Sequence, residues 1–267
     1  MLLSVCVSAP IPSTGAEPDL NELFRQGETA APSRVALTSP LCSAFNDFNN
    51  LIRDGLISKA VARPEFIVRL AAIRAEFYLR GGTDYSATQW VFPVAGYDAG
   101  AIDKGRNHGF VPSGYDFFSG NRHGGHPAYD IFIRDQNQDS RDDRSGKAVS
   151  VLSMTGGIVV ALEKEWHKGS TLRGGKYIWV YDPANELLVY YAHNEELLVE
   201  LGSIVKPGDL LATIGRSGLN AAKKRSPTHL HFSVLHVNNG QPMPVRVYRE
   251  LLQAREHSTL QNRDTDQ

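Results

Sequence analysis

The fold is indicated most directly by residues 228–237, which read THLHFSVLHV. Apolar and polar side chains alternate at the start of this stretch, which is the period of a β-strand. In a strand, His229 and His231 project from one face, and Leu230 and Phe232 project from the other. The apolar pair then faces a core, while the two imidazoles, about 7 Å apart, face a groove. The stretch therefore predicts a half-buried strand with two histidines on its open face.

Further strand-like segments lie upstream of this one, from residue 90 onward. They are short, rich in β-branched and aromatic residues, and separated by turn signals. The segments are WVFPV (90–94), YDIFI (129–133), GGIVVALEK (156–164), KYIWVYD (176–182), LLVYYAH (187–193) and LLATIG (210–215). DPAN at 182–185 fits a loop between antiparallel strands, and KPGD at 206–209 fits a tight turn. We predict an α+β, mainly β fold class: an antiparallel sheet that carries a groove.

The segment before the strands has the apolar spacing of helices. FNDFNNLIRDGLI (45–57) and PEFIVRLAAIRAEFYLR (64–80) carry apolar residues at three- and four-residue intervals, with Gly55 and Pro64 as punctuation. This predicts a small helical hairpin whose apolar faces contact the sheet domain. The predicted organisation is a disordered leader or linker at 1–39, the helical hairpin at 40–88, the sheet domain at 89–252 and a disordered tail at 253–267.

Composition limits the classes of partner. The net charge of −1 over 267 residues gives no reason to expect nucleic acid or an anionic membrane surface. No apolar run approaches the ~18 residues of a transmembrane span. The first residues, MLLSVCVSAPIPSTG, resemble the end of a secretory leader but lack its positively charged start. An unstructured tail is the other interpretation of this segment.

The stretch GGHPAYDIF (124–132) places a histidine and an aspartate four residues apart. Pro127 biases His126 to extended geometry and removes a backbone donor, so His126 and Asp130 do not share a helix face cleanly. In a straight strand their side chains would lie roughly 13 Å apart. The chain must therefore bend between them if they act together. Two imidazoles and one carboxylate can hold zinc with a fourth position left open for water.

The spacing of the other histidines leaves their roles open. His229 and His231 fit two metal ligands, one ligand and one base, or merely a polar strand face. His193 ends the strand at 187–193, where, taken alone, a solvated histidine is the simpler interpretation.

The combination of motifs resembles the lysostaphin-type (LytM-domain) zinc endopeptidases that cut peptidoglycan peptides. The shared elements are His-x-x-x-Asp at 126–130, Tyr-x-His at 191–193, the turn, strand and turn VKPGDLLATIGRSG at 205–218, and His-x-His at 229–231. The resemblance covers roughly residues 90–250. It implies a groove domain of LytM type, one zinc ion, a peptidoglycan peptide as substrate, and a secreted or periplasmic location in the cell envelope.

The resemblance also implies a role for each motif residue. His126, Asp130 and His231 would be zinc ligands, and His193 and His229 would be unligated catalytic histidines. The expected function is zinc-dependent hydrolysis of peptide bonds in peptidoglycan cross-links by a metal-activated water. The alternative is a non-catalytic LytM-like module that binds wall peptides or activates a partner hydrolase. A third possibility is that activity requires the helical segment to leave the groove.

Three further residues are candidates at this site. His123 competes with His126 as a ligand, but it leaves a seven-residue gap to Asp130, and the family register favours His126. Tyr115 and Arg225 are candidate substrate contacts, one in the loop before the metal motif and one in the basic run 223–225. A packed or solvated loop residue is the other interpretation of each.

The insert DQNQDSRDD (135–143) spaces oxygen atoms like a calcium loop. Asp135, Asn137 and Asp139 are the candidate calcium ligands. The insert lacks the glycine at the sixth position and the late glutamate of a helix-loop-helix calcium loop. A solvated acidic hairpin is therefore the other interpretation.

Overall fold

The computed structural model describes residues 39–261, with side chains described through residue 254. Residues 1–38 of the predicted leader (1–39) and residues 262–267 lie outside the described residues. The elements are, in chain order, α2 (Pro40–Arg53), α3 (Lys59–Leu79), η1 (Ala87–Gln89), η2 (Ala99–Ala101), η3 (Arg106–Gly109), η4 (Phe117–Arg122), β1 (Tyr129–Phe132), β2 (Ser150–Leu152), β3 (Gly157–Glu163), β4 (Lys176–Asp182), β5 (Leu187–Leu197), β6 (Ile204–Val205), β7 (Leu210–Ile214), β8 (His229–Asn238), β9 (Gln241–Pro244) and α4 (Tyr248–Gln261).

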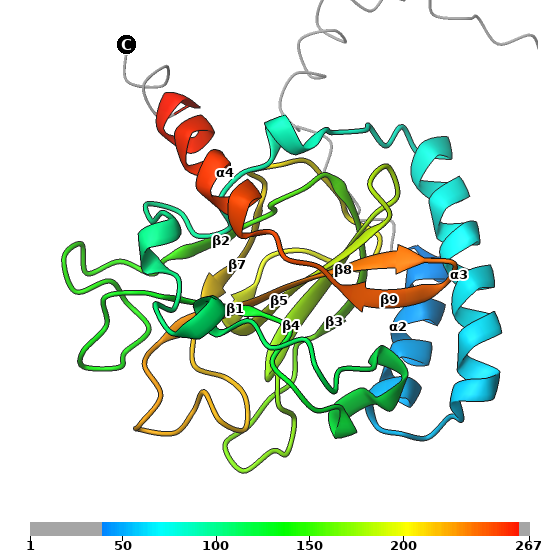
Figure 1. The fold of residues 1–267 in the computed structure, drawn as a ribbon, viewed down its shortest axis with the longest axis horizontal. Helices are drawn as coiled ribbons and strands as arrows, with labels where there is room; N and C mark the ends of the chain where they lie inside the picture. Colours follow the sequence, from blue (N-terminus) through cyan, green and yellow to red (C-terminus); the bar gives the residue numbers. More distant parts are fainter. Residues whose placement is uncertain (1–38, 262–267) are drawn as a thin grey trace, which may run out of the picture. The chain divides into compact units, whose positions relative to one another are not determined.

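The strands of residues 39–261 form one sheet with the order β1-β8-β5-β4-β3-β6 (Figure 1). Strand β9 pairs with β8, and β7 joins β2 to β5. Each of these pairings is antiparallel. The predicted mainly β, antiparallel class with an N-terminal helical segment is therefore confirmed.

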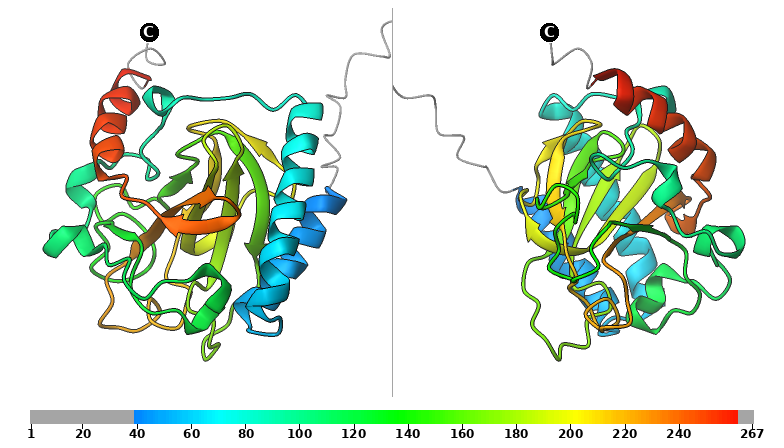
Figure 2. Two further views of the ribbon diagram at one scale, coloured as in Figure 1. Left: turned by 45° about the vertical axis from the view of Figure 1, so that its right-hand side comes forward. Right: turned by 90° about the vertical axis from the view of Figure 1, so that its left-hand side faces the viewer.

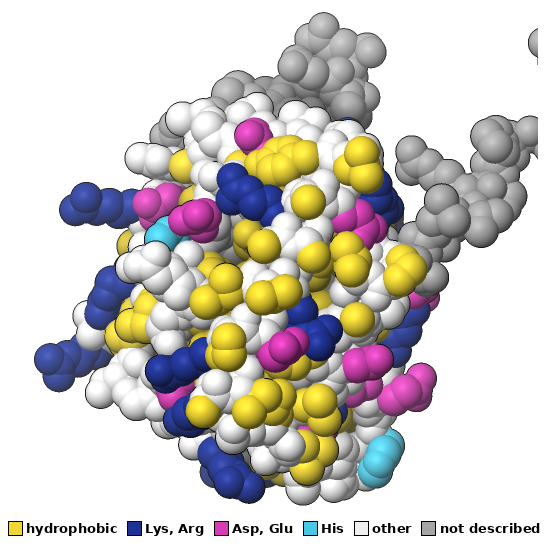
Figure 3. All heavy atoms as spheres, turned by 90° about the vertical axis from the view of Figure 1, so that its right-hand side faces the viewer, with side chains coloured by type: hydrophobic (Ala, Val, Ile, Leu, Met, Phe, Trp, Pro, Cys, Tyr) yellow, Lys and Arg dark blue, Asp and Glu magenta, His cyan; other side chains and the backbone are white. Residues whose placement is uncertain are grey.

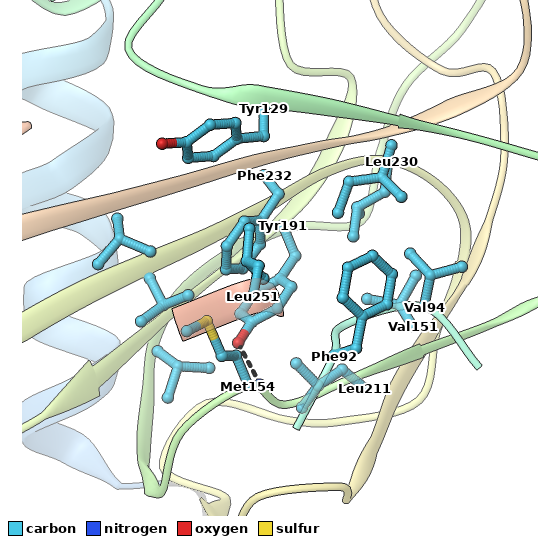
Figure 4. Close-up of a cluster of buried hydrophobic side chains, with 14 of the residues drawn as sticks. Phe92, Val94, Tyr129, Val151, Met154, Tyr191, Leu211, Leu230, Phe232 and Leu251 are labelled. Atoms are coloured by element: carbon cyan, nitrogen blue, oxygen red, sulfur yellow. Dashed lines mark hydrogen bonds between the residues drawn. The ribbon is translucent and has the colours of Figure 1, made fainter. Parts of the chain in front are cut away.

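One face of the sheet contacts a core made by the loops and the C-terminal helix. Phe92, Tyr129, Tyr191, Phe232 and Leu251 belong to this cluster, and each is nearly or fully buried. Figure 4 shows the hydroxyl of Tyr191 beside Met154, whose backbone N–H donates a hydrogen bond of 2.8 Å to it. Because that bond satisfies the one polar group of a fully buried ring, Tyr191 can sit in an apolar core.

The helical hairpin covers the sheet at β3 and β4 (Figure 2). Phe45 of α2 and Phe66 of α3 are buried in one cluster with Ile158 of β3 and Trp179 of β4. Ser39 connects the two helices, because its hydroxyl accepts from the backbone of Cys42 and donates to Glu76. Burying an aromatic or aliphatic side chain of this size contributes about 1.5–3 kcal/mol, so the hairpin is held firmly by several such residues.

Three element assignments differ from the sequence prediction. WVFPV (90–94) is not a strand; only Val94 makes an isolated bridge, to Val151, because Pro93 offers no ladder donor. Helix α3 begins at Lys59 and includes Pro64 in its second turn. The segment from residue 253, predicted to be a disordered tail, is instead helical through Gln261, because α4 extends over it. Leu251 and Ala254 of this helix are buried against the core.

The outer face of α3 is partly apolar. Figure 3 looks onto this side and shows hydrophobic side chains scattered between basic ones. Val61, Ile67 and Val68 of α3 are among the exposed large hydrophobic residues. None of the helices in the described part of the chain is both long and apolar enough to span a membrane.

The η4 segment meets the end of α2 at Gly120. This glycine has φ +52°, and a Cβ there would lie 2.2 Å from the carbonyl oxygen of Ile52. The close approach brings the loop that precedes the predicted metal motif against the helical hairpin.

Gly120→Ala is expected to lower the free energy of unfolding by roughly 1–3 kcal/mol, through backbone strain plus this clash. Gly146→Ala is the matched control, because Gly146 also has positive φ but has nothing within 4 Å of its added Cβ. Urea unfolding of both variants measures the difference. Equal losses in the two variants would show that the contact between η4 and α2 is unimportant.

Candidate active site

The edge strand β1 and its neighbour β8 bring the central residues of the site together. Asp130 on β1 lies directly opposite His231 on β8, and Phe132 lies opposite His229. The side chains of Asp130 and His231 are partly exposed. Leu230 and Phe232, the residues on either side of His231 in β8, are fully buried. Strand alternation therefore turns the polar side chains to the open face, as the sequence of β8 predicts.

His126 reaches the same place from just outside β1. Its backbone forms an isolated bridge with Val111, with two hydrogen bonds of 2.7 Å. Its Nδ1 lies 2.9 Å from the carbonyl oxygen of Gly109, so Nδ1 carries the proton and donates. Nε2 is then free, and it lies 3.3 Å from Oδ1 of Asp130. The chain bends at Ala128, between the histidine and the strand.

One carboxylate oxygen stands at the centre of the group. Oδ1 of Asp130 is 3.3 Å from Nε2 of His126 and 3.0 Å from Nδ1 of His231. Ligand atoms bound at 2.0–2.2 Å in a tetrahedron are about 3.3–3.6 Å apart, so small shifts would admit an ion. The three ligand atoms all lie within 4.8 Å of one another. Donor types and spacing therefore fit a zinc site with one open position.

The electrostatics of the group favour an ionised carboxylate. Burial alone would raise the pKa of Asp130, but the neighbouring imidazoles of His126 and His231 outweigh it and hold the pKa well below its ordinary value. Burial lowers the pKa of His231, which opposes protonation of that imidazole. An anionic carboxylate beside a neutral imidazole is the protonation state in which both can bind a cation.

His229 is held with one nitrogen directed to the site. Its Nδ1 lies 2.8 Å from the carbonyl oxygen of Pro227, and because a carbonyl only accepts, Nδ1 donates. Its Nε2 points to the candidate site, 3.7 Å from Oδ1 of Asp130. An imidazole nitrogen in this position is placed for proton transfer beside the candidate metal ligands.

His193 faces the same position from β5 by means of a β-bulge. Strand β4 pairs Tyr177 with Ala192 and Lys176 with Asn194, so His193 is the extra residue, and its φ is +69°. Its Nδ1 donates to the carbonyl oxygen of Ser217 at 2.8 Å. Its ring centroid lies 4.9 Å from that of His229.

The surroundings of His193 keep it neutral. Burial, together with the neighbouring imidazoles of His229 and His231, lowers its pKa well below the ordinary value. Gly218 permits this close approach, because a Cβ there would lie 2.8 Å from Nδ1 of His193. Contact with His193 therefore explains why the turn GRSG (215–218) ends in a glycine.

A cavity of about 230 Å³ opens beside these histidines. His126, His193 and His231 line it together with aromatic residues of β4, β5 and the η4 segment, and with one face of α2. The pocket-lining residues that sequence patterns did not single out include Asn49, Arg53, Arg173, Tyr177, Trp179 and Tyr190. No local motif could reveal them, because they come together only through contacts between distant segments.

The remaining candidate residues fall in different places. Tyr115 lines the cavity, and its ring contacts His123 at a centroid distance of 4.7 Å. His123 directs Nδ1 to its neighbour Gly124, so His126 alone of these two histidines faces Asp130. Arg225 lies exposed on the loop before β8 and does not line this cavity.

The oxygen atoms of the predicted calcium loop accept hydrogen bonds from within the loop and from Thr228. The carboxylate of Asp135 is buried and accepts from the backbone of Asp139 and Ser140 and from the hydroxyl of Thr228. Asn137 donates to and accepts from Asp139. These bonds account for the loop's shape without an ion, and calcium stays a prediction.

Comparison with known proteins agrees with the motifs. Residues 141–244 match the model of peptidase family M23, which confirms the resemblance to LytM-type proteins. The matched range includes His193, His229 and His231, whereas His126 and Asp130 precede it. No curated protein matches the chain.

Three solved structures illustrate the structural likeness. A lytM protein from Ruminococcus gnavus is 28% identical, covering 49% of this chain and 47% of that one, with a TM-score of 0.36. A zinc containing peptidase from Vibrio cholerae is 21% identical, with 61% and 39% covered and a TM-score of 0.37. The antimicrobial peptidase lysostaphin from Staphylococcus simulans is 20% identical, with 55% and 49% covered and a TM-score of 0.35. The chain therefore spans half or less of each of these proteins.

Proposed function

From the match to peptidase family M23, we propose that the chain is a zinc-dependent endopeptidase that hydrolyses peptide bonds in peptidoglycan cross-links. It would act in the cell envelope, as a secreted or periplasmic protein. The observation that carries the proposal is the convergence of His126, Asp130 and His231 on one point, with the imidazoles of His193 and His229 beside it.

The ligand set would be Nε2 of His126, Oδ1 of Asp130 and Nδ1 of His231. Zinc bound there would supply Lewis acidity and lower the pKa of a coordinated water to about 7. The hydrogen bond from His126 to Gly109 fixes which nitrogen faces the ion, which is how a backbone carbonyl supports a metal-binding imidazole.

His193 and His229 would move the protons of the reaction. Each has Nδ1 fixed on a backbone carbonyl, so each presents Nε2 as a base. One would take a proton from the attacking water, and the resulting imidazolium would stabilise the oxyanion or protonate the leaving amine. Both rings lie next to the proposed metal ligands, so either histidine could act as the general base.

Digestion of purified peptidoglycan tests this function. The full chain is expected to release cross-link fragments, identified by mass spectrometry, and prior removal of metal with a chelator should abolish release. Added zinc should restore it, while calcium or magnesium should not, because imidazole ligands suit zinc. Unchanged digestion after complete zinc removal, checked by elemental analysis, would contradict the zinc-dependent mechanism.

The same experiment separates the alternative function. A non-catalytic LytM-like module would bind peptidoglycan without releasing fragments, or would release them only with a partner hydrolase present. The complete ligand set and the two flanking histidines support the enzyme instead, since a binding module has no need for all five side chains.

A further inference from the structure

The cavity beside the metal group is bounded by α2, and this limits what can occupy it. The strands run β8, β5, β4 and β3 away from His231, and strands in a sheet are about 4.8 Å apart. Arg53 of α2 reaches Glu163 on β3 at 2.9 Å and the hydroxyl of Tyr177 on β4 at 3.1 Å. A chain that crosses the strands from His231 therefore meets α2 after about 10 Å, the length of about three extended residues.

This boundary is a fixed part of the fold. Phe45, Phe48 and Ile52 of α2 are almost completely buried. Detaching the helix would expose all three, at about 1.5–3 kcal/mol each. The η4 segment reinforces the boundary, since Gly120 allows it to touch the last turn of α2. A peptide that continues in both directions would collide with this wall, so the cavity suits the end of a chain.

The charge of the cavity indicates which end. Among the described residues that line it, two arginines are present and no acidic residue. Arg53 is already paired with Asp54 and Glu163. Arg173 instead donates Nη1 only to the backbone oxygens of Asn121 and His123, and no carboxylate in residues 39–254 forms an ion pair with it.

Arg173 is therefore a cation without an anionic partner among residues 39–254, at the rim of the cavity. Guanidinium groups bind carboxylates through paired N–H donors, and Nε and Nη2 of Arg173 make none of the bonds described above. Its position on the β3–β4 loop, one residue before Gly174, keeps it close to His193, whose N–H donates to the Gly174 carbonyl.

We infer that this cavity takes a short peptide end that bears a free carboxylate, and that Arg173 is the residue that selects it. The inference rests on the proposed peptidase function, and it narrows the substrate class. The preferred scissile bond then lies within about three residues of a free carboxyl terminus.

Binding of three peptidoglycan stem peptides tests the inference. One has a free terminal carboxylate, the second is its C-terminal amide, and the third is the free acid extended by four glycines. Calorimetry on the full chain is expected to give about fivefold tighter binding of the short free acid than of the other two. The factor is modest because Arg173 is exposed and its charge is screened.

Variants show whether Arg173 causes the preference. Arg173→Gln should bind the acid and the amide alike, and Arg173→Lys should keep part of the preference because the charge remains. Arg144→Gln, which changes an exposed arginine outside the cavity, should behave as the unaltered chain. If Arg173 only holds neighbouring loops together, Arg173→Gln would leave the ratio of the acid and amide affinities unchanged.

The outcomes separate the inference from the proposed function. Equal binding of acid, amide and extended peptides, no binding of any of them, or a preference that survives in Arg173→Gln overturns the inference. Cleavage of the same peptides is measured in parallel. Binding with the expected preference but without cleavage supports the carboxylate pocket and contradicts the hydrolase. Cleavage of peptidoglycan without the binding preference supports the hydrolase and contradicts the carboxylate pocket.

Discussion

Asp130→Asn is expected to remove zinc from the protein and to lower peptidoglycan hydrolysis by about a thousandfold or more. The change keeps the size of the side chain and removes its negative charge. Because Oδ1 of Asp130 lies at the centre of three imidazoles, no other described group can replace it as the anionic ligand. Elemental analysis gives the zinc content, and mass spectrometry of released fragments gives the activity.

The control for this variant is Asp84→Asn. Asp84 is exposed, accepts a hydrogen bond from Tyr78 and lies outside the site. It should keep one zinc ion and full activity. Circular dichroism must show that both variants are folded. A folded Asp130→Asn protein with a full complement of zinc and undiminished hydrolysis would contradict the assignment of Asp130.

A second pair of variants locates the metal on β8. His231→Ala should lose zinc, since it deletes one of the two proposed imidazole ligands. His236→Ala changes a histidine of the same strand whose Nε2 faces Glu186 at 3.9 Å instead of the site, and it should retain zinc. Equal zinc content in the two variants would show that β8 does not contribute the ligand.

The sequence was sufficient for two local features of the candidate site, because each is set by neighbouring residues or by the period of a strand. Alternation in β8 turns His231 to the open face, and Pro127 biases His126 to the extended geometry in which it bridges Val111. Both inferences use only neighbouring residues. The resemblance then supplied the order in which the motifs occur, which no local rule provides.

What the sequence could not reveal depends on long-range contacts. The bulge that gives His193 a φ of +69° arises from the pairing of β5 with β4, and residue spacing carries no signal for it. Arg53, which forms part of the cavity wall, is more than a hundred residues away in the sequence from its partner Glu163. Helix α4 was missed because only a few apolar residues, such as Leu251, mark its buried face in a polar segment.

The two histidines that flank the metal group should separate catalysis from metal binding. His193→Ala and His229→Ala are each expected to keep one zinc ion but to lose about a hundredfold to ten-thousandfold in hydrolysis, the usual contribution of a general acid or base. Neither residue belongs to the proposed ligand group of His126, Asp130 and His231. The zinc content and the rate are measured on the same samples.

The double variant shows whether the two rings act in one process. If His193 and His229 share the same proton transfers, removing both should cost little more than removing one, because catalytic groups that act as a unit are not additive. His167→Ala, which changes an exposed loop histidine, is the control and should leave both zinc and rate unchanged. Loss of zinc from either single variant would show that the histidine is a metal ligand. Full activity in both single variants would show that neither ring takes part in proton transfer.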